Sequence, residues 1–248
     1  MKKAMVVLSG GQDSTTCLFW ALSHFDEVEA ISFDYGQRHS IELDSARKIA
    51  AMACVPHSVV TFSPGMLRST SPLTSNSVLE QYNNATEMDS IIGTRVEKTF
   101  VPMRNTLFLT VATNHALAAG ASALVTGICQ ADNANYPDCT EHFRLLMERL
   151  VCQSLGLGDK GFQILAPLMN CSKADTVRLA KSMPRCWAAL AYSHTSYDGK
   201  YPPVDMNHAN VLRAAGFEEA GEPDPLVLRA FFEGKMNLPM SKNYDDYR

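Results

Sequence analysis

Along the first quarter of the chain, short runs rich in apolar residues alternate with stretches whose apolar residues recur at helical spacing. The runs at 6–8, 28–33 and 57–62 are typical of buried strands. Between them, 15–25 and 40–54 carry apolar residues three and four positions apart, which predicts amphipathic helices. This alternation predicts an α/β fold with a doubly wound, mainly parallel sheet, which binds ligands at the carboxyl ends of its strands.

The pattern changes after the third strand. Residues 63–98 are polar and crowded with Ser, Thr and Asn, which predicts a long surface excursion of the kind that forms lids. Residues 106–119 are apolar nearly all round and predict a buried helix, and 123–126 predicts a further strand. Helices are expected at 138–152 and 172–182. The apolar residues of the first of these are Phe143, Leu146, Met147 and Leu150.

We expect a catalytic domain over residues 1–183 and a small C-terminal helical extension over 184–248. In the extension, Asp224 before Pro225 is typical of a helix start and Gly234 of a helix end. The predicted helix would bury Val227, Ala230 and Phe231. Dimerisation and lid packing are both open as its role.

Composition narrows the function. With 248 residues, 46% of them apolar, the chain can bury a sizeable core. A net charge of −4 without a basic run gives no footprint for a nucleic-acid backbone, so small molecules are the expected substrates. No stretch is apolar enough for a membrane span and the chain does not start like a signal peptide, so we expect a cytoplasmic protein. Seven scattered cysteines without a CxxC pair argue against a disulfide scaffold.

The segment SGGQDS at 9–14 lies between the first predicted strand and the first predicted helix. Two adjacent glycines allow close approach of the backbone to a ligand, and the N–H groups of a helix start attract an anion. A Walker A loop has a Lys just before its Ser or Thr, whereas this loop has Asp13. An acidic residue suits Mg²⁺ or an ordered water, and a loop without the Lys suits pyrophosphate as a leaving group. The segment therefore predicts a phosphate site of a different class.

Polar clusters follow other predicted strands or open helices, at 34–39, 101–105, 126–132 and 136–139. Taken singly, each could be a turn, a helix cap or a solvated side chain. Four clusters at successive strand ends favour a binding site, in which Arg104 could offer its fork of donors to a phosphate or a carboxylate.

SGGQDS resembles the SGGxDS signature of the PP-loop ATP pyrophosphatase superfamily, whose members split ATP into AMP and pyrophosphate. Five further segments extend the resemblance to the 7-cyano-7-deazaguanine synthase family, over about the first 180 residues: FDYGQRH (33–39), VPMRN (101–105), TGICQAD (126–132), YPDC (136–139) and PLMNCSKADT (167–176). The resemblance implies an enzyme that adenylates the carboxylate of 7-carboxy-7-deazaguanine and aminates it with ammonia. A second ATP would then drive dehydration of the amide to the nitrile.

The resemblance also implies roles for individual residues. Catalysis would fall to Asp13, Arg104 and Lys173. The residues implied for ATP and Mg²⁺ are Ser9, Gly10, Gly11, Gln12, Asp13, Ser14, Phe33, Tyr35, Arg38, Asn105 and Gly127. The residues implied for the deazaguanine are Asp132, Tyr136 and Asp138.

Residue chemistry agrees with these roles but leaves alternatives. A guanine-like edge presents two neighbouring donors, for which the carboxylate of Asp138 or Asp132 is a natural acceptor. Tyr136 is either a stacking platform or a core aromatic. Lys173 either stabilises charge on the reacting phosphate or is a solvated helix residue that follows the Ser172 cap.

The chain departs from the family pattern after Cys186, its last cysteine. A typical member has a further cysteine and a CxxCxxC cluster that together bind structural zinc. Here Cys186, His194 and His208 would give three ligands at most, whereas a structural zinc site needs four. We therefore expect no zinc. Packing is expected in its place, by Tyr192, Tyr197, Tyr201 and two prolines.

Three functions remain open. The first is the nitrile synthase. The second is an enzyme of a phage or antiphage-defence cluster, where relatives of the family also occur, which would join the activated deazaguanine to an amine such as a protein N-terminus. The third is a nucleotide-binding module without catalysis, which the retention of Asp13, Arg104 and Lys173 disfavours. A homodimer is expected in either enzymatic case.

Overall fold

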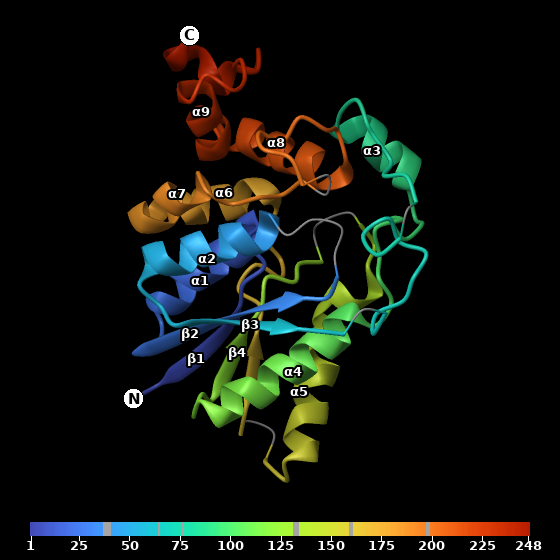
Figure 1. The fold of residues 1–248 in the computed structure, drawn as a ribbon, viewed down its shortest axis with the longest axis vertical. Coiled ribbons are helices and arrows are strands. Elements are labelled where there is room, and N and C mark those ends of the chain that lie inside the picture. Colours follow the sequence, from blue (N-terminus) through green and yellow to red (C-terminus); the bar gives the residue numbers. More distant parts are fainter. Residues whose placement is uncertain (37–40, 64, 76, 131–133, 159–160, 197–198) are drawn as a thin grey trace.

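The computed structural model describes residues 1–36, 41–63, 65–75, 77–130, 134–158, 161–196 and 199–248. Its centre is a five-stranded parallel sheet with the strand order β3-β2-β1-β4-β5 (Figure 1). The strands are β1 (Lys3–Val7), β2 (Glu27–Asp34), β3 (His57–Thr61), β4 (Ala123–Val125) and β5 (Gln163–Leu165). This confirms the predicted doubly wound fold. The sequence analysis missed β5, an edge strand in which only Ile164 is fully buried.

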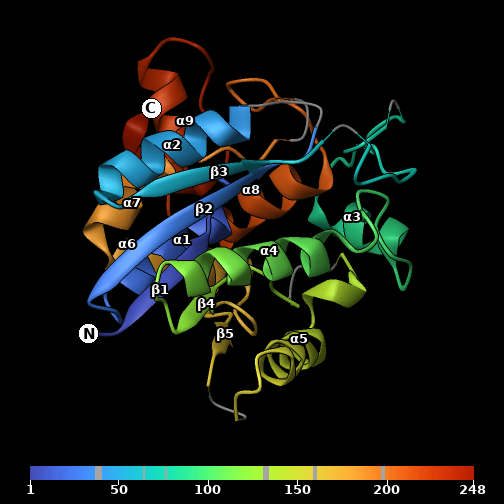
Figure 2. The same ribbon diagram turned by 60° about the horizontal axis from the view of Figure 1, so that its bottom comes forward.

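Helices cover both faces of the sheet (Figures 1 and 2). One face carries α1 (Gln12–Leu22), α2 (Ile41–Ala53), α6 (Lys173–Ser182) and α7 (Pro184–Leu190). The other face carries α4 (Arg104–Ala118) and α5 (Glu141–Ser154). Buried side chains form one cluster on each face. Parallel strands that are covered on both sides are rich in apolar residues, which fits β1 and most of β2. The strand β3 lies at the edge of the sheet and none of its residues is fully buried, so the expectation of a buried strand there is wrong.

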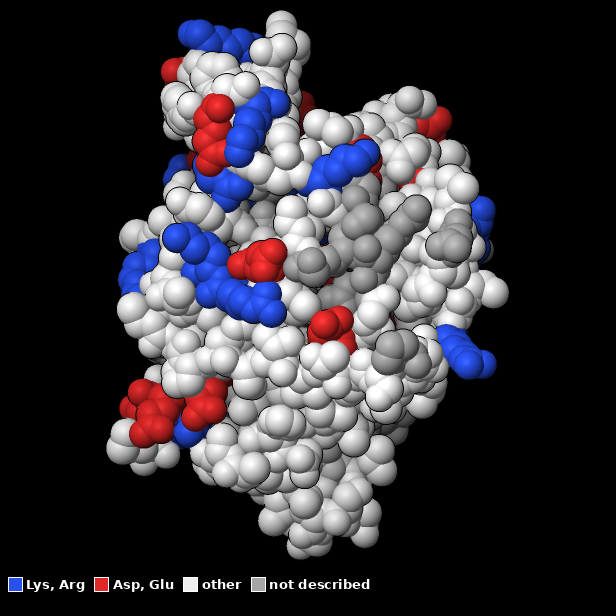
Figure 3. All heavy atoms as spheres, viewed as in Figure 1, with Lys and Arg blue, Asp and Glu red and all other residues white. Residues whose placement is uncertain are grey.

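The two helices α4 and α5 correct the sequence analysis. Helix α4 is not buried all round: Leu109 and Ala116 face the sheet, while Leu117 is 36% exposed. Helix α5 begins only at Glu141, after the short 3₁₀ turn Pro137–Cys139, and its Leu146 and Leu150 are 50% and 55% exposed. Both helices lie in an outer layer, so only one stripe of each is covered. In Figure 3, the part of the molecule that projects lowest in the view shows no Lys, Arg, Asp or Glu, whereas charged side chains lie at its lower left.

The excursion 63–98 is more structured than expected. It contains α3 (Ala85–Ile92), capped by Asn84, whose side chain accepts a hydrogen bond from Glu87 N. Tyr82, Met88 and Ile92 are buried in a third cluster together with Val211 of α8 (His208–Ala220). The excursion is therefore tied to the C-terminal part of the chain (Figure 1).

The predicted extension, 184–248, contains α7, which packs on the sheet, and then α8, α9 (Pro225–Phe232) and a 3₁₀ segment (Lys242–Tyr247). As predicted, Asp224 caps α9, accepting a hydrogen bond from Leu226 N at 2.9 Å. Of the residues expected to be buried in this helix, only Ala230 is; Val227 and Phe231 are half-buried. The division at 183/184 stays a prediction, although Cys186, Leu190 and Phe217 share the core cluster of β1.

The region that departs from the family pattern is held by two groups of contacts. The Arg229 guanidinium lies 4.1 Å from the ring centroid of Tyr201 and 4.7 Å from that of Tyr192. The Asp205 carboxylate accepts hydrogen bonds from Ser196, Asn207 and Asn210. The aromatic packing was expected, but the polar network was not. Tyr197 lies outside the described residues.

Within the described part of the chain, no three His, Cys, Asp or Glu side chains gather as a metal site would require. The absence of zinc stays a prediction. None of the helices in the described ranges is long and apolar enough to cross a membrane.

Candidate active site

A cavity of about 590 Å³ opens at the carboxyl ends of the central strands. It lies where the strand order reverses between β1 and β4, the place where doubly wound sheets bind ligands. Its walls come from the 9–14 loop, the ends of β2 and β4, the start of α4 and residues 134–140. Residues 194–196 and the first half of α8 complete the cavity on the C-terminal side.

The 9–14 loop has the backbone that the glycines predicted. Gly10 has φ +90°, and a Cβ there would overlap the backbone oxygen of Glu42 on α2. Gly11 is the N-cap of α1 and, as a glycine, has no side chain that could cap the helix. The N–H groups of a helix start attract an anion, so this end of α1 suits a phosphate.

Further contacts hold the loop in place. The hydroxyl oxygens of Ser9 and Ser14 lie 3.0 Å apart, and Ser9 N donates to Ser14 Oγ at 3.2 Å. His194 N donates to Gly10 O at 2.8 Å, which joins the loop to the C-terminal part of the chain. A Cβ on Gly127 would lie 3.1 Å from Ser14 N, so only a residue without a side chain fits closely there. The predicted Gly127 is therefore in contact with the loop.

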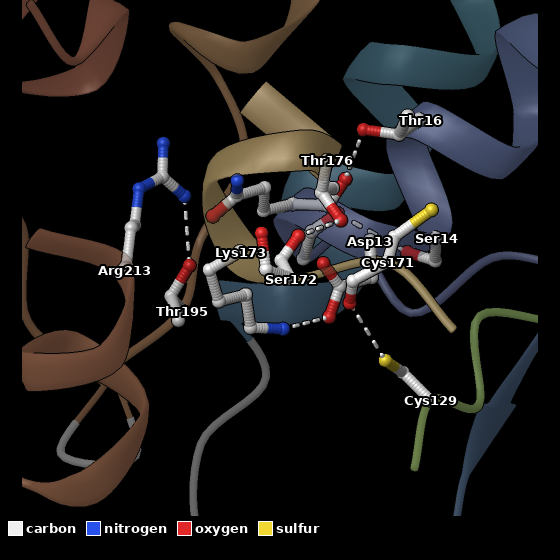
Figure 4. A network of polar contacts seen from close by, with 12 residues as sticks. Asp13, Ser14, Thr16, Cys129, Cys171, Ser172, Lys173, Thr176, Thr195 and Arg213 are labelled. Atoms are coloured by element: carbon white, nitrogen blue, oxygen red, sulfur yellow. Dashed lines mark hydrogen bonds and ion pairs between the residues drawn. The ribbon is translucent and has the colours of Figure 1, made fainter. Parts of the chain in front are cut away.

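Lys173 is far from the 9–14 loop in the sequence but contacts it in the folded chain. Its Nζ lies 2.6 Å from Asp13 Oδ2, and the two side chains are 13% and 23% exposed (Figure 4). Ser172 and Asp175 form a capping box that starts α6 at Lys173. Gly216 of α8 leaves room for this arrangement, because a Cβ there would lie 2.5 Å from Lys173 Cβ. Lys173 is thus not a solvated helix residue, and the interpretation as a site residue is favoured.

Arg104, at the start of α4, lines the cavity near a phenol, Tyr35, and a carboxyl group, Glu42. It hydrogen-bonds with Tyr35 and interacts electrostatically with Glu42. Burial raises the pKa of Glu42 to about 7, although Arg104 opposes that rise. Glu42 is a cavity residue that the sequence analysis missed, since only its place at the start of a helix after a strand end could have suggested it.

Aromatic rings form another wall. Phe33, at the end of β2, stacks on Phe108 of α4 with 4.4 Å between the ring centroids, and Tyr35 packs against Phe108 at 5.3 Å. All three line the cavity. Flat rings beside an anion site suit a nucleobase, as predicted for Phe33 and Tyr35.

Of the described residues that were predicted to bind the deazaguanine, one lines the cavity and the other does not. Tyr136 lines the cavity, whereas Asp138 is not among the described residues that do. Burial raises the pKa of the Asp138 carboxyl, and this rise is opposed by Arg104 and by hydrogen bonds from Asn105. Asn105 also donates to Asp138 O at 3.2 Å. Asp138 therefore holds the first turn of α4.

Two predicted residues, Arg38 and Asp132, lie outside the described residues. The sequence analysis also missed the C-terminal wall. His194, Thr195 and His208 line the cavity, in the region where the family pattern is lost. No sequence signal pointed to them, because their role depends on how α8 packs on α6.

The cavity can hold a phosphorylated ligand. The helix start and the cations Lys173 and Arg104 suit phosphate oxygens, and the aromatic wall suits a base. Tyr136 adds a further aromatic ring to the lining of the cavity.

Comparison with known proteins gives close relatives. The chain is 48% identical to the 7-cyano-7-deazaguanine synthase of Laribacter hongkongensis, over 91% of this chain and 94% of that protein. It is 46% identical to the synthase of that name from Chromobacterium violaceum, over 94% and 97% of the two chains. The synthase of Gloeobacter violaceus is 44% identical, over 91% and 96%.

Solved structures give weaker matches. A 4-thiouridine synthetase–RNA complex with bound ATP aligns with 93% of this chain and 53% of its own, at 18% identity and a TM-score of 0.42. The NMN synthetase of Francisella tularensis aligns with 97% and 80% of the two chains, at 14% identity and a TM-score of 0.39. The family model described as queuosine biosynthesis protein QueC matches residues 3–221. The chain therefore belongs to the QueC family.

Proposed function

We propose that this protein uses ATP to activate the carboxylate of 7-carboxy-7-deazaguanine, aminates it with ammonia and dehydrates the amide to 7-cyano-7-deazaguanine. The observation that carries the proposal is the Asp13–Lys173 pair beside a glycine loop that has no Walker lysine. Membership of the QueC family and relatives named 7-cyano-7-deazaguanine synthase support it.

In this proposal the loop of residues 9–14 holds the β- and γ-phosphates, which leave as pyrophosphate. A carboxylate oxygen of the base attacks the α-phosphorus, and Lys173 stabilises the negative charge that builds up there. Arg104 orients the carboxylate or the phosphate. Ammonia then attacks the acyl carbon, AMP leaves, and the new amide oxygen is adenylated in a second round.

Mg²⁺ fits this arrangement because it is usually bound by one or two carboxylates together with substrate phosphates. Asp13 belongs to the loop and lines the cavity, so we assign its carboxylate to the ion. When bound, the ion would supply positive charge to the phosphates. Asp13 would then exchange its contact with Lys173 for the ion, which leaves Lys173 available for the reacting phosphate.

The first test is the nucleotide product. We expect AMP and pyrophosphate from ATP in the presence of Mg²⁺ and the deazaguanine, as separated by ion-exchange chromatography. Asp13→Asn should lose at least about 100-fold in turnover, the scale of a lost electrostatic group in an active site, with an unchanged melting temperature. ADP and phosphate as products would show that the PP-loop proposal is wrong.

A second prediction concerns the carboxylate that reads the guanine-like edge. We propose Asp132 for this role, because Asp138 faces Asn105 and Arg104. Asp132→Ala should weaken binding of 7-carboxy-7-deazaguanine by about 2–5 kcal/mol and leave ATP binding unchanged, as measured by calorimetry. The matched variant Asp138→Ala should weaken the binding of both the deazaguanine and ATP. If Asp138→Ala weakened binding of the deazaguanine but not of ATP, Asp138 would be the residue that binds the guanine-like edge.

The homodimer stays a prediction from the sequence, and a protein acceptor for the activated base belongs to the alternative, conjugating function. Light scattering tests the dimer. The acceptor is tested by the mass of the product, since a conjugated base stays on a protein.

A further inference from the structure

One buried carboxylate near the cavity has no part in the proposed reaction. Glu97, in the excursion 63–98, is 2% exposed and does not appear among the described residues that line the cavity. A carboxylate that is almost fully removed from water requires partners. Glu97 has them in Thr99 and Tyr136, and Tyr136 belongs to the cavity wall.

The contacts of Glu97 converge on Tyr136. Glu97 Oε2 accepts hydrogen bonds from Thr99 N at 2.7 Å and from the Tyr136 hydroxyl at 3.1 Å. The Thr99 hydroxyl also contacts both Glu97 Oε2 and the Tyr136 hydroxyl. The Tyr136 ring packs against Phe100, with 5.4 Å between the ring centroids. These contacts fix both the tip and one side of the Tyr136 ring.

The backbone beside Tyr136 is held by the same segment. Glu97 N donates to Ala134 O at 3.0 Å. The Asn135 side chain donates to Gly93 O at 3.0 Å and to Arg95 O at 2.9 Å, while Asn135 itself has the left-handed φ of 53°. Residues 93–99 therefore act as a brace behind the cavity wall at 134–136.

We propose that Glu97 is a positioning residue for the base half of the cavity, which holds the ring of Tyr136 in the orientation that a planar heterocycle stacks on. This inference rests on the proposed function for the identity of the heterocycle. Its physical basis is preorganisation: a ring that is already fixed loses no rotamer freedom when the ligand binds. ATP, which the loop at 9–14 and the wall at Phe33 would hold, does not depend on this contact.

The test is steady-state kinetics with 7-carboxy-7-deazaguanine, ATP, Mg²⁺ and ammonium. We expect Glu97→Ala to raise KM for the deazaguanine about five- to tenfold, the cost of ordering one side chain, while kcat and KM for ATP change less than about twofold. Glu97→Gln, which keeps one acceptor oxygen, should show a smaller rise. Tyr136→Phe combined with Glu97→Ala should raise KM for the deazaguanine no further than the more impaired of the two single variants, because both changes remove the same contact.

The matched control is Glu87→Gln. Glu87 lies in the same segment and accepts a hydrogen bond from Asn83 N at 2.6 Å, and its described contacts do not reach residues 93–99 or 134–136. It should leave KM for the deazaguanine unchanged. An equal rise in both KM values for Glu97→Ala, or no rise in either, would overturn the inference.

A crystal structure of Glu97→Ala tests the positioning without any substrate. We expect the Tyr136 ring to shift or to become disordered relative to the wild type. An unmoved, ordered ring would overturn the inference even if the protein acts on another base. Failure of the wild type to use 7-carboxy-7-deazaguanine, together with a displaced ring in the variant, would instead count against the proposed function alone.

Discussion

Glu42 is the residue whose charge we expect to change within the physiological pH range. Its pKa of about 7 results from burial, so the side chain is mostly neutral at pH 6 and mostly ionised at pH 8. The ionised form adds a negative charge to a cavity that is proposed to bind a polyphosphate, and it also attracts Arg104. Protonation of Glu42 should therefore favour binding of ATP.

We predict that the affinity for ATP with Mg²⁺ falls about fivefold between pH 6 and pH 8, the scale of an interaction between partly solvated charges. Glu42→Gln should remove most of this dependence. Isothermal titration calorimetry measures the affinity of the wild type and of Glu42→Gln at both pH values. The ionisation of ATP affects both proteins equally, so a difference between their pH profiles reports on Glu42. Identical pH profiles for the two proteins would contradict the assigned role of Glu42.

Among the elements, α8 and α9 are joined through one buried ion pair. Arg213 is 3% exposed and donates to Asp224 through Nε at 2.6 Å and through a second nitrogen at 2.9 Å. Another of its nitrogens donates to Thr195 at 2.7 Å and to Ser193 at 2.9 Å (Figure 4 shows the Thr195 contact). Arg213 thus links the cavity wall at 193–195 to the cap of α9.

Arg213→Met should lower the free energy of unfolding by about 3–5 kcal/mol, because it leaves the Asp224 carboxylate buried without its partner. The double variant Arg213→Met/Asp224→Asn should recover part of this loss, since it removes the uncompensated charge. Urea denaturation followed by circular dichroism measures both. A loss below about 1 kcal/mol in the single variant would mean that water reaches Asp224.

The elements also show what the sequence could predict. The strands β1, β2 and β3 were predictable because each contains several apolar residues in a short stretch next to a predicted helix, although β2 and β3 also carry polar residues. The 9–14 loop was predictable because its residues are contiguous in the sequence. The short β5, the exposed side of α4 and the burial of Tyr82 and Met88 were not, because they depend on which surfaces meet after folding. Glu42 and Glu97 were missed for the same reason, since Glu97 meets Tyr136 across 39 positions.

At the scale of the whole molecule, the cavity is closed by segments from both ends of the chain. The N-terminal loop accepts a hydrogen bond from His194, and α8 packs on α6 at Lys173 through Gly216. The region without the family's cysteines is thus part of the cavity wall and not a separate appendage. A change in this region could alter which nitrogen nucleophile reaches the activated base.

The nature of that nucleophile determines how much ATP each product requires. Ammonia leaves a primary amide, which can be adenylated again and lose its two N–H protons to become a nitrile. An amine on a protein leaves a secondary amide, which carries a carbon substituent and cannot become a nitrile. The reaction would then stop after one ATP.

The most direct measurement is therefore the ratio of AMP to product, together with the product mass. The purified protein is incubated with 7-carboxy-7-deazaguanine, ATP, Mg²⁺ and ammonium, and the mixture is analysed by mass spectrometry. We predict the free nitrile with about two AMP for each molecule formed, as the family's chemistry implies. Absence of the nitrile, with the base bound covalently to a protein and one AMP released, would contradict the proposed function in favour of conjugation.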